Sequence, residues 1–112
     1  MRVIDTSSPF GSSSRTRVLL ALRILGESYA RELSRLLELS LSSAQKALQS
    51  LERDGLVAAR PAGRTRLFRL NPRHHAITEL ERYLDRLLEP EVALRARVSA
   101  IRRRPRRTGK PL

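Results

Sequence analysis

The sequence of 112 residues contains no cysteine. This absence excludes disulfide bonds and any reaction that needs a thiolate, and it fits a reducing compartment. The sequence also lacks an apolar stretch of membrane-spanning length, and its first residues, MRVIDTSSPFGSSS, lack the apolar run of a signal peptide. A cytoplasmic protein with no membrane partner is therefore predicted. The length allows one domain with tails, and it leaves little chain for a deep catalytic cleft.

Residues that carry catalysis or bind metal are also scarce. The chain has no glycine-rich phosphate loop, no helix with His and Glu at ligand spacing, and no histidine beside a nucleophile in a known motif. Its only histidines, His74 and His75, are adjacent, and on a helix they would point about 100° apart, which does not suit one ion. We therefore predict a protein that is not an enzyme and has no cofactor and no metal.

Aromatic side chains are few and scattered. The chain has two phenylalanines, two tyrosines and no tryptophan. Proteins that bind single-stranded nucleic acid stack bases on clustered aromatic rings. RNA binding through the arginines therefore has little support, and it stays a third option.

Acidic residues are missing from the C-terminal end, and this accounts for most of the net charge of +12. Residues 1–91 carry 15 cationic and 11 acidic side chains, whereas residues 92–112 carry 8 cationic side chains and no acidic one. Apart from Lys46 and Lys110, every cation is an arginine, which suits bidentate binding of phosphate and guanine. A polyanionic partner is predicted. The alternative is a tail that only keeps the chain soluble.

Apolar residues recur at helical spacing through the first half of the chain. A first helix is predicted from a cap at Ser14 to Gly26, and a short second helix after a cap at Ser28. A third follows at once over residues 41–54, with Ser40 as its cap. Two helices joined by so short a turn, the second with a polar outer face, form a helix-turn-helix.

The third predicted helix has one apolar face and one face almost free of negative charge. Leu41, Ala44, Leu48 and Leu51 recur at helical spacing, so this side is expected to join the core. Glu52 is the first carboxylate in the segment. The other side carries hydroxyls, amides and cations, which can contact base edges and phosphates: Ser42, Ser43, Gln45, Lys46, Gln49 and Arg53. An ordinary solvated face is the alternative.

After this helix the pattern changes to the period of a strand. LVAAR and TRLFRL are short strand-like runs separated by PAG, which predicts a hairpin. Phe68 and Leu70 are expected to face inward and Arg66 outward. Arg64, Thr65 and Arg66 lie at or beside the predicted tip and are candidate contacts to DNA.

Two further helices are predicted after the hairpin. The first begins at Asn71-Pro72, with Asn71 as its cap. Its apolar residues follow the 3-4-3 spacing of a two-helix seam: Ile77, Leu80, Leu84 and Leu87. This seam predicts a dimer contact, and packing within the chain is the alternative. The second helix extends through Ile101, and disorder is predicted beyond it.

These elements predict a mainly α fold with a small β-hairpin wing (α+β). An N-terminal arm over residues 1–13 precedes a winged helix-turn-helix, with a three-helix core plus wing, over residues 14–71. A C-terminal helix over residues 72–89 is expected to mediate dimerisation. A basic, arginine-rich tail, partly helical and then disordered, occupies residues 90–112.

Three stretches together resemble the winged helix-turn-helix regulators of the ArsR/MarR type: YARELSRLL, LSLSSAQKALQSLERDGLV and GRTRLFRLNP. The resemblance implies a recognition helix in the major groove and a wing on the backbone or an adjacent minor groove. It also implies a prokaryotic transcriptional regulator, often a repressor, that binds as a homodimer. Metal-sensing members of this group use cysteine and histidine ligands, and this chain has no cysteine.

The residue chemistry supports the same role for the third helix. Gln45 and Gln49 can pair with adenine, Lys46 with guanine, and Ser42 or Ser43 with bases or phosphates. The predicted function is sequence-specific binding of double-stranded DNA by a dimeric regulator. The alternative is a protein-interaction module on the same scaffold, an antitoxin or an adaptor linked to a nucleotidyltransferase.

Overall fold

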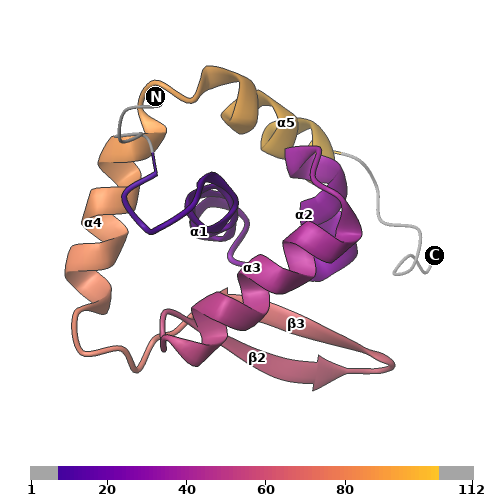
Figure 1. Ribbon diagram of the computed structural model, residues 1–112. Coiled ribbons are helices and arrows are strands. Elements are labelled where there is room, and N and C mark those ends of the chain that lie inside the picture. The colour runs from indigo at the N-terminus through magenta and orange to yellow at the C-terminus, as the bar shows by residue number, and fades with distance from the viewer. Residues whose placement is uncertain (1–7, 104–112) are drawn as a thin grey trace, which may run out of the picture.

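The computed structural model describes residues 8–103, which form five helices and a three-stranded antiparallel sheet (Figure 1). The helices are α1 (Ser13–Leu25), α2 (Ala30–Leu37), α3 (Leu41–Arg53), α4 (Ile77–Leu88) and α5 (Val92–Arg103). The strands are β1 (Glu27–Ser28), β2 (Val57–Ala62) and β3 (Thr65–Leu70), with β3 between the other two. The mainly α fold with a β-hairpin wing is confirmed. Most of the predicted N-terminal arm and the end of the predicted basic tail lie outside the described residues.

Helix α1 forms the centre of the core, and Figure 1 shows the other helices and the hairpin arranged around it. Its residues from Val18 to Leu22 are all buried. Leu33 of α2, Leu51 of α3 and Leu84 of α4 have no exposed surface and join the same apolar cluster. Burying a leucine of this kind contributes roughly 1.5–3 kcal/mol to folding. None of the helices in the described residues is long and apolar enough to cross a membrane.

Two helix starts differ from the prediction. Ser12, not Ser14, is the cap of α1, because its Oγ accepts a hydrogen bond from the backbone N–H of Arg15 at 3.1 Å. Ser28 does not cap α2, because it lies in β1, where it is buried and its hydroxyl donates to the Glu32 Oε1 at 2.6 Å. With only two residues, β1 is too short to give the alternating pattern by which strands are predicted.

Both ends of α3 agree with the prediction to within one residue. The Oγ of Ser40 accepts a hydrogen bond from the Ser43 backbone N–H at 3.0 Å and so caps the first turn. Arg53 is the last helical residue, and Gly55 then adopts a φ of 84°, which glycine tolerates without strain. Helices α2 and α3 therefore form the predicted helix-turn-helix.

The wing is the hairpin of β2 and β3, and in Figure 1 it projects to one side, away from α1. Its register pairs Ala62 with Thr65 beside the turn, where Gly63 has a φ of 64°. Phe68 is buried and Arg66 is exposed, as predicted, but the period of two is not the reason, because residues two apart lie on the same face of a strand. Arg66 is exposed because it lies closer to the tip of the hairpin. The hairpin therefore attaches to the core through its base and leaves its tip in solvent.

The predicted helix start at Asn71 is wrong, because α4 begins at Ile77 and residues 71–76 form turns. The side chain of Asn71 stabilises the turn instead. Its Oδ1 accepts a hydrogen bond from the Arg73 backbone N–H at 3.0 Å, and its Nδ2 donates to the Gly55 carbonyl at 2.9 Å. An Asn side chain often forms such hydrogen bonds to nearby backbone groups in a turn, and it then does not cap a helix.

His74 and His75 lie in these turns rather than on a helix, so the predicted divergence of their side chains is wrong. Their rings stack, with centroids 4.7 Å apart and ring planes 17° apart. The Nδ1 of His74 accepts a hydrogen bond from the Ala76 backbone N–H at 3.0 Å. Within residues 8–103, no group of three or more His, Cys, Asp and Glu side chains is arranged to hold a metal ion.

The predicted dimer seam of α4 faces the core of its own chain. Leu80 and Leu84 are buried in the cluster that includes α1, and only Ile77 and Leu87 are half-buried at its edge. Leu80 and Leu84 thus pack within the chain, which is the alternative that the 3-4-3 spacing left open. A dimer contact through Ile77 and Leu87 stays a prediction.

An ion pair also joins α4 to α1. The Arg23 Nε lies 2.8 Å from Asp85 Oδ1, and its Nη2 lies 3.1 Å from Oδ2. These hydrogen bonds lower the pKa of Asp85 below its ordinary value and raise that of Arg23. Both side chains are partly exposed, so the pair contributes at most about 1 kcal/mol.

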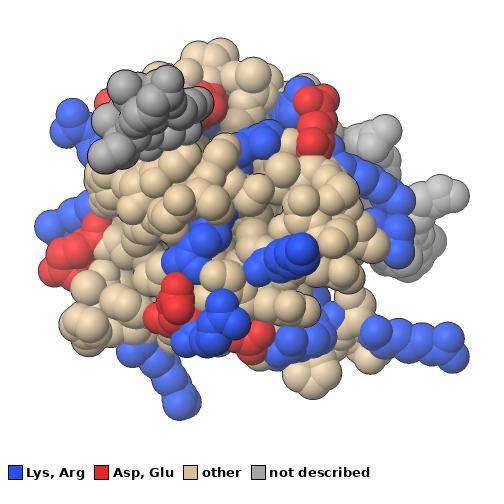
Figure 2. Space-filling view, in the orientation of Figure 1, with Lys and Arg blue, Asp and Glu red and all other residues tan. Residues whose placement is uncertain are grey.

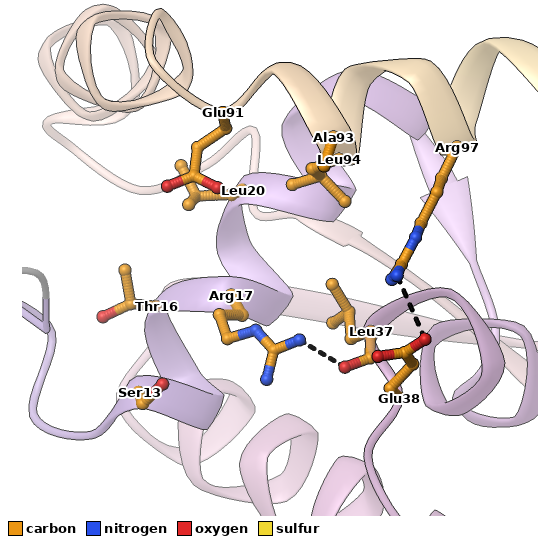
Figure 3. A pocket seen from close by; sticks show the side chains of 10 residues that line it. All are labelled: Ser13, Thr16, Arg17, Leu20, Leu37, Glu38, Glu91, Ala93, Leu94 and Arg97. Carbon is orange, nitrogen blue, oxygen red and sulfur yellow. Dashed lines mark hydrogen bonds and ion pairs between the residues drawn. The ribbon is translucent and has the colours of Figure 1, made fainter.

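Two arginines of other helices bind the C-terminal carbonyls of α2. Figure 3 shows Arg17 at Leu37 and Arg97 at Glu38. Arg17 of α1 donates to the Leu37 carbonyl. Arg97 of α5 donates to the Leu36 carbonyl at 2.9 Å and to the Glu38 carboxylate at 3.0 Å. The last carbonyls of a helix have no partner within it, so these guanidinium groups complete their hydrogen bonding. The contacts border a hollow of about 300 Å³ and tie α1 and α5 to the turn that leads into α3.

Candidate nucleic-acid interface

The buried residues of α3 fix which of its faces meets solvent. Ala44, Leu48 and Leu51 are at most 1% exposed and hold one side of the helix against the core. The opposite face is open, with five predicted contact residues exposed and a sixth, Ser43, half-buried. The exposed residues are Ser42, Gln45, Lys46, Gln49 and Arg53. Residues 8–103 therefore leave the predicted DNA-binding face uncovered.

The charged side chains on this side of α3 differ in whether they form ion pairs. Lys46 and Arg53 form no ion pair with another described residue. Glu52, the one carboxylate of α3, lies with its Oε2 2.8 Å from the Nη2 of Arg66 in the wing. Its negative charge is thus largely compensated, and the cations Lys46 and Arg53 give the face a positive potential.

Two of the arginines of the wing, Arg64 and Arg66, differ in whether they form an ion pair. Arg64 and Thr65 are exposed at the tip, and Arg64 forms no ion pair within the described part of the chain. Arg66 is paired with Glu52, and its guanidinium carbon lies 5.3 Å from the centroid of the Phe68 ring. Sequence reasoning missed this pair, because its members are 14 residues apart on different elements.

Two hollows flank α3 and bring the predicted residues together. One, of about 320 Å³, lies between α3 and the wing and is lined by Gln45, Gln49, Arg64, Thr65, Arg66 and Phe68. The other, of about 280 Å³, lies between α3 and the start of α1 and is lined by Ser12, Ser14, Arg15, Ser43, Lys46 and Ser50. Ser42 and Arg53 border neither hollow. Seven of the nine predicted residues thus border a concave surface.

Arg15 fixes the start of α1 to the end of α3. Its Nη2 lies 2.8 Å from Asp54 Oδ2, its Nε donates to the Phe10 carbonyl at 2.6 Å, and its Nη1 donates to the Ser50 hydroxyl.

Figure 2 shows Lys and Arg side chains gathered over α3 and the hairpin on this face, with a few acidic side chains among them. An exposed helix, a projecting hairpin and clustered cations together form a surface suited to a polyanion.

Residues 12–73 match the family model described as "Sugar-specific transcriptional regulator TrmB". The chain belongs to the TrmB family of transcriptional regulators. The matched residues run from the cap of α1 through the turns after β3, so they contain the helix-turn-helix and the wing. The protein is accordingly a DNA-binding transcriptional regulator with a winged helix-turn-helix, as predicted. The family and the fold are those of regulators rather than enzymes.

Several solved structures are similar to this TrmB-family chain. Reduced HlyU from Vibrio cholerae N16961 is 34% identical, with a TM-score of 0.57 over 68% of this chain and 77% of that chain. A point mutant of Lactococcus lactis ZitR is 17% identical, with a TM-score of 0.59 over 80% of this chain and 61% of that one. The adhesin competence repressor AdcR of Streptococcus pyogenes is 17% identical, with a TM-score of 0.54 over 81% and 74%. The last two support the fold alone. No curated protein matches the sequence closely.

Proposed function

We propose that this protein binds specific sequences of double-stranded DNA as a homodimer, with α3 in the major groove and the wing on the backbone or an adjacent minor groove. The observation that carries the proposal is the exposed, carboxylate-poor face of α3, held outward by three buried apolar residues. A helix fits the major groove of B-DNA, where each base pair presents its own pattern of donors and acceptors. The protein acts by binding alone, without catalysis, cofactor or metal, in the cytoplasm.

The side chains of α3 divide into readers of bases and binders of phosphate. Gln45 and Gln49 supply amides that pair with adenine, and Lys46 supplies a donor for the guanine O6 and N7. Ser42 and Ser43 lie in the first turn, where short hydroxyls and the positive end of the helix dipole favour a phosphate. Arg53, at the other end, is placed to neutralise a second phosphate.

The wing contributes charge through Arg64. Arg64→Ala is expected to weaken binding to all duplex sequences alike, because a guanidinium at a hairpin tip meets phosphates rather than base edges. The slope of log affinity against log salt should become shallower by about 0.9. Fluorescence anisotropy over a salt series measures both quantities. Arg82→Ala, which removes an exposed arginine from α4, is the control and should leave the slope unchanged. A sequence-dependent loss for Arg64→Ala would contradict the assignment.

The arginines near the C-terminus add affinity for DNA of any sequence. Each phosphate that they neutralise steepens the dependence of this affinity on salt concentration.

Dimerisation would place two copies of α3 on half-sites about 34 Å apart. Of the four predicted seam residues, only Ile77 and Leu87 keep exposed surface for a partner. On the same helix Tyr83 is 45% exposed, so a contact through α4 would use these three side chains.

Selection of bound sequences from random duplex DNA at near-physiological salt tests the proposal. Enrichment of a palindrome with half-sites one helical turn apart is expected, because a symmetric dimer reads the same sequence on both strands. Enrichment of a single half-site would support base reading and contradict the dimer. A flat outcome would contradict sequence-specific binding and favour the interaction-module alternative.

A further inference from the structure

The one carboxylate of the recognition helix holds an arginine of the wing. Glu52 lies in the last turn of α3, and its Oε2 is 2.8 Å from the Nη2 of Arg66 on β3. The guanidinium group of Arg66 also lies over the Phe68 ring, 5.3 Å from its centroid. Phe68 is only 6% exposed and anchored in the core. Arg66 is therefore held between a carboxylate and a fixed aromatic ring.

This pair stands at the edge of the surface proposed to meet DNA. Arg66 lines the hollow between α3 and the wing together with Gln45 and Gln49. Glu52 follows Gln49 by three residues, so it lies on the same side of α3 one turn further on. A phosphate that enters this hollow meets Arg66 while the guanidinium is still bound to Glu52.

The pair is weak enough to be displaced. The side chains of Arg66 and Glu52 are 52% and 34% exposed, and ion pairs between exposed groups are strongly screened by water and salt. A phosphate offers the same bidentate geometry as a carboxylate and belongs to a strand of far higher charge. Arg66 is thus available to DNA, but only after it leaves Glu52.

We infer that Glu52 determines specificity by occupying Arg66, so that Arg66 binds phosphate only where base contacts of α3 hold the wing close to the duplex. This inference rests on the proposed function of α3 and the wing. On random DNA, where α3 makes no such contacts, Arg66 stays with Glu52, and of these two wing arginines only Arg64 contributes to binding. The carboxylate therefore lowers affinity for random DNA more than affinity for the preferred sequence.

Glu52→Gln tests this role, because glutamine keeps the shape of the side chain and removes its charge. Affinity for random duplex should rise about fivefold near 0.15 M salt, with a slope steeper by about 0.9, as expected for one added phosphate contact. Affinity for the preferred sequence should change less than about twofold. The ratio of the affinity for the preferred sequence to the affinity for random duplex therefore falls. Equal increases for both kinds of DNA would overturn the inference.

A double-mutant cycle separates this role from simple repulsion between Glu52 and DNA. Arg66→Gln alone leaves Glu52 without its partner, so binding to random duplex should weaken slightly. The rise caused by Glu52→Gln should be clearly smaller in the Arg66→Gln background than in the parent, because no arginine is then freed to bind phosphate. A rise as large in this background as in the parent would assign Glu52 to general repulsion and overturn the inference. Glu27→Gln is the matched control, since it opens the exposed Glu27–Arg60 pair elsewhere on the sheet, and no rise is expected from it.

The outcomes also separate this inference from the proposed function. If Arg64→Ala leaves the salt slope unchanged, or if selection from random DNA enriches no sequence, the proposed DNA-binding surface is contradicted. Normal results in both, with no change in the preference ratio for Glu52→Gln, would overturn only the role of Glu52. Thermal unfolding of each variant without DNA should match that of the parent to within a few degrees, since exposed ion pairs contribute little to stability.

Discussion

Replacing Leu84 by alanine is expected to lower the free energy of unfolding by about 2–5 kcal/mol. Leu84 has no exposed surface and lies in the cluster formed around α1. Alanine would leave a cavity in the middle of α4, and the surrounding helices could close it only in part. A small domain with a stability of about 5–15 kcal/mol would lose a large fraction of it.

Urea unfolding followed by circular dichroism at several protein concentrations measures this loss. Because Leu84 packs within its own chain, the loss should not depend on protein concentration. Leu87→Ala is the control on the same helix, and it should cost clearly less since Leu87 is half-buried. A loss that disappears at high protein concentration would instead assign Leu84 to a dimer contact.

Lys46→Ala is expected to weaken binding to the preferred sequence by about 1–3 kcal/mol, which is about 5- to 150-fold. Lys46 is exposed on α3 and free of ion pairs with the other described residues, so its ammonium group can reach a guanine. Removal of a base contact relaxes the preference at one base pair. Removal of a phosphate contact would leave that preference intact.

Competition binding with duplexes that differ at single positions measures this effect. The variant should lose discrimination at one position in each half-site and keep it at the others. Arg82→Ala, on α4, serves again as the control. Uniform weakening on every duplex would show that Lys46 binds phosphate, and no weakening would remove it from the interface.

The helix-turn-helix could be predicted from the sequence because several local signals agree over residues 28–57. Leu48 and Leu51 repeat at helical spacing, Ser40 supplies a cap, and Gly55 supplies the conformation that ends α3. Each of these signals acts within a few residues, so it is visible without knowledge of the fold. The exposed face of α3 followed directly from its buried face.

Elements that depend on partners far along the chain could not be predicted in the same way. Asn71 is predicted as a helix cap, and its side chain instead bonds the Gly55 carbonyl and the following turn. Leu80 and Leu84 have a spacing that serves a dimer seam and a core helix equally well. The pairing of Glu52 with Arg66 depends on how the wing folds back beside α3, which no local pattern encodes.

Arg97 joins α5 to the end of α2, next to the turn that leads into α3, so a ligand that bound α5 and moved this guanidinium would also change the affinity for DNA. Such a ligand would remove the donor from the Leu36 carbonyl and so loosen one of the two arginine contacts that hold the end of α2. By reciprocity, bound DNA then disfavours that ligand by the same factor. An inducer of this kind would act from outside the DNA-binding face, without competing for a single base or phosphate.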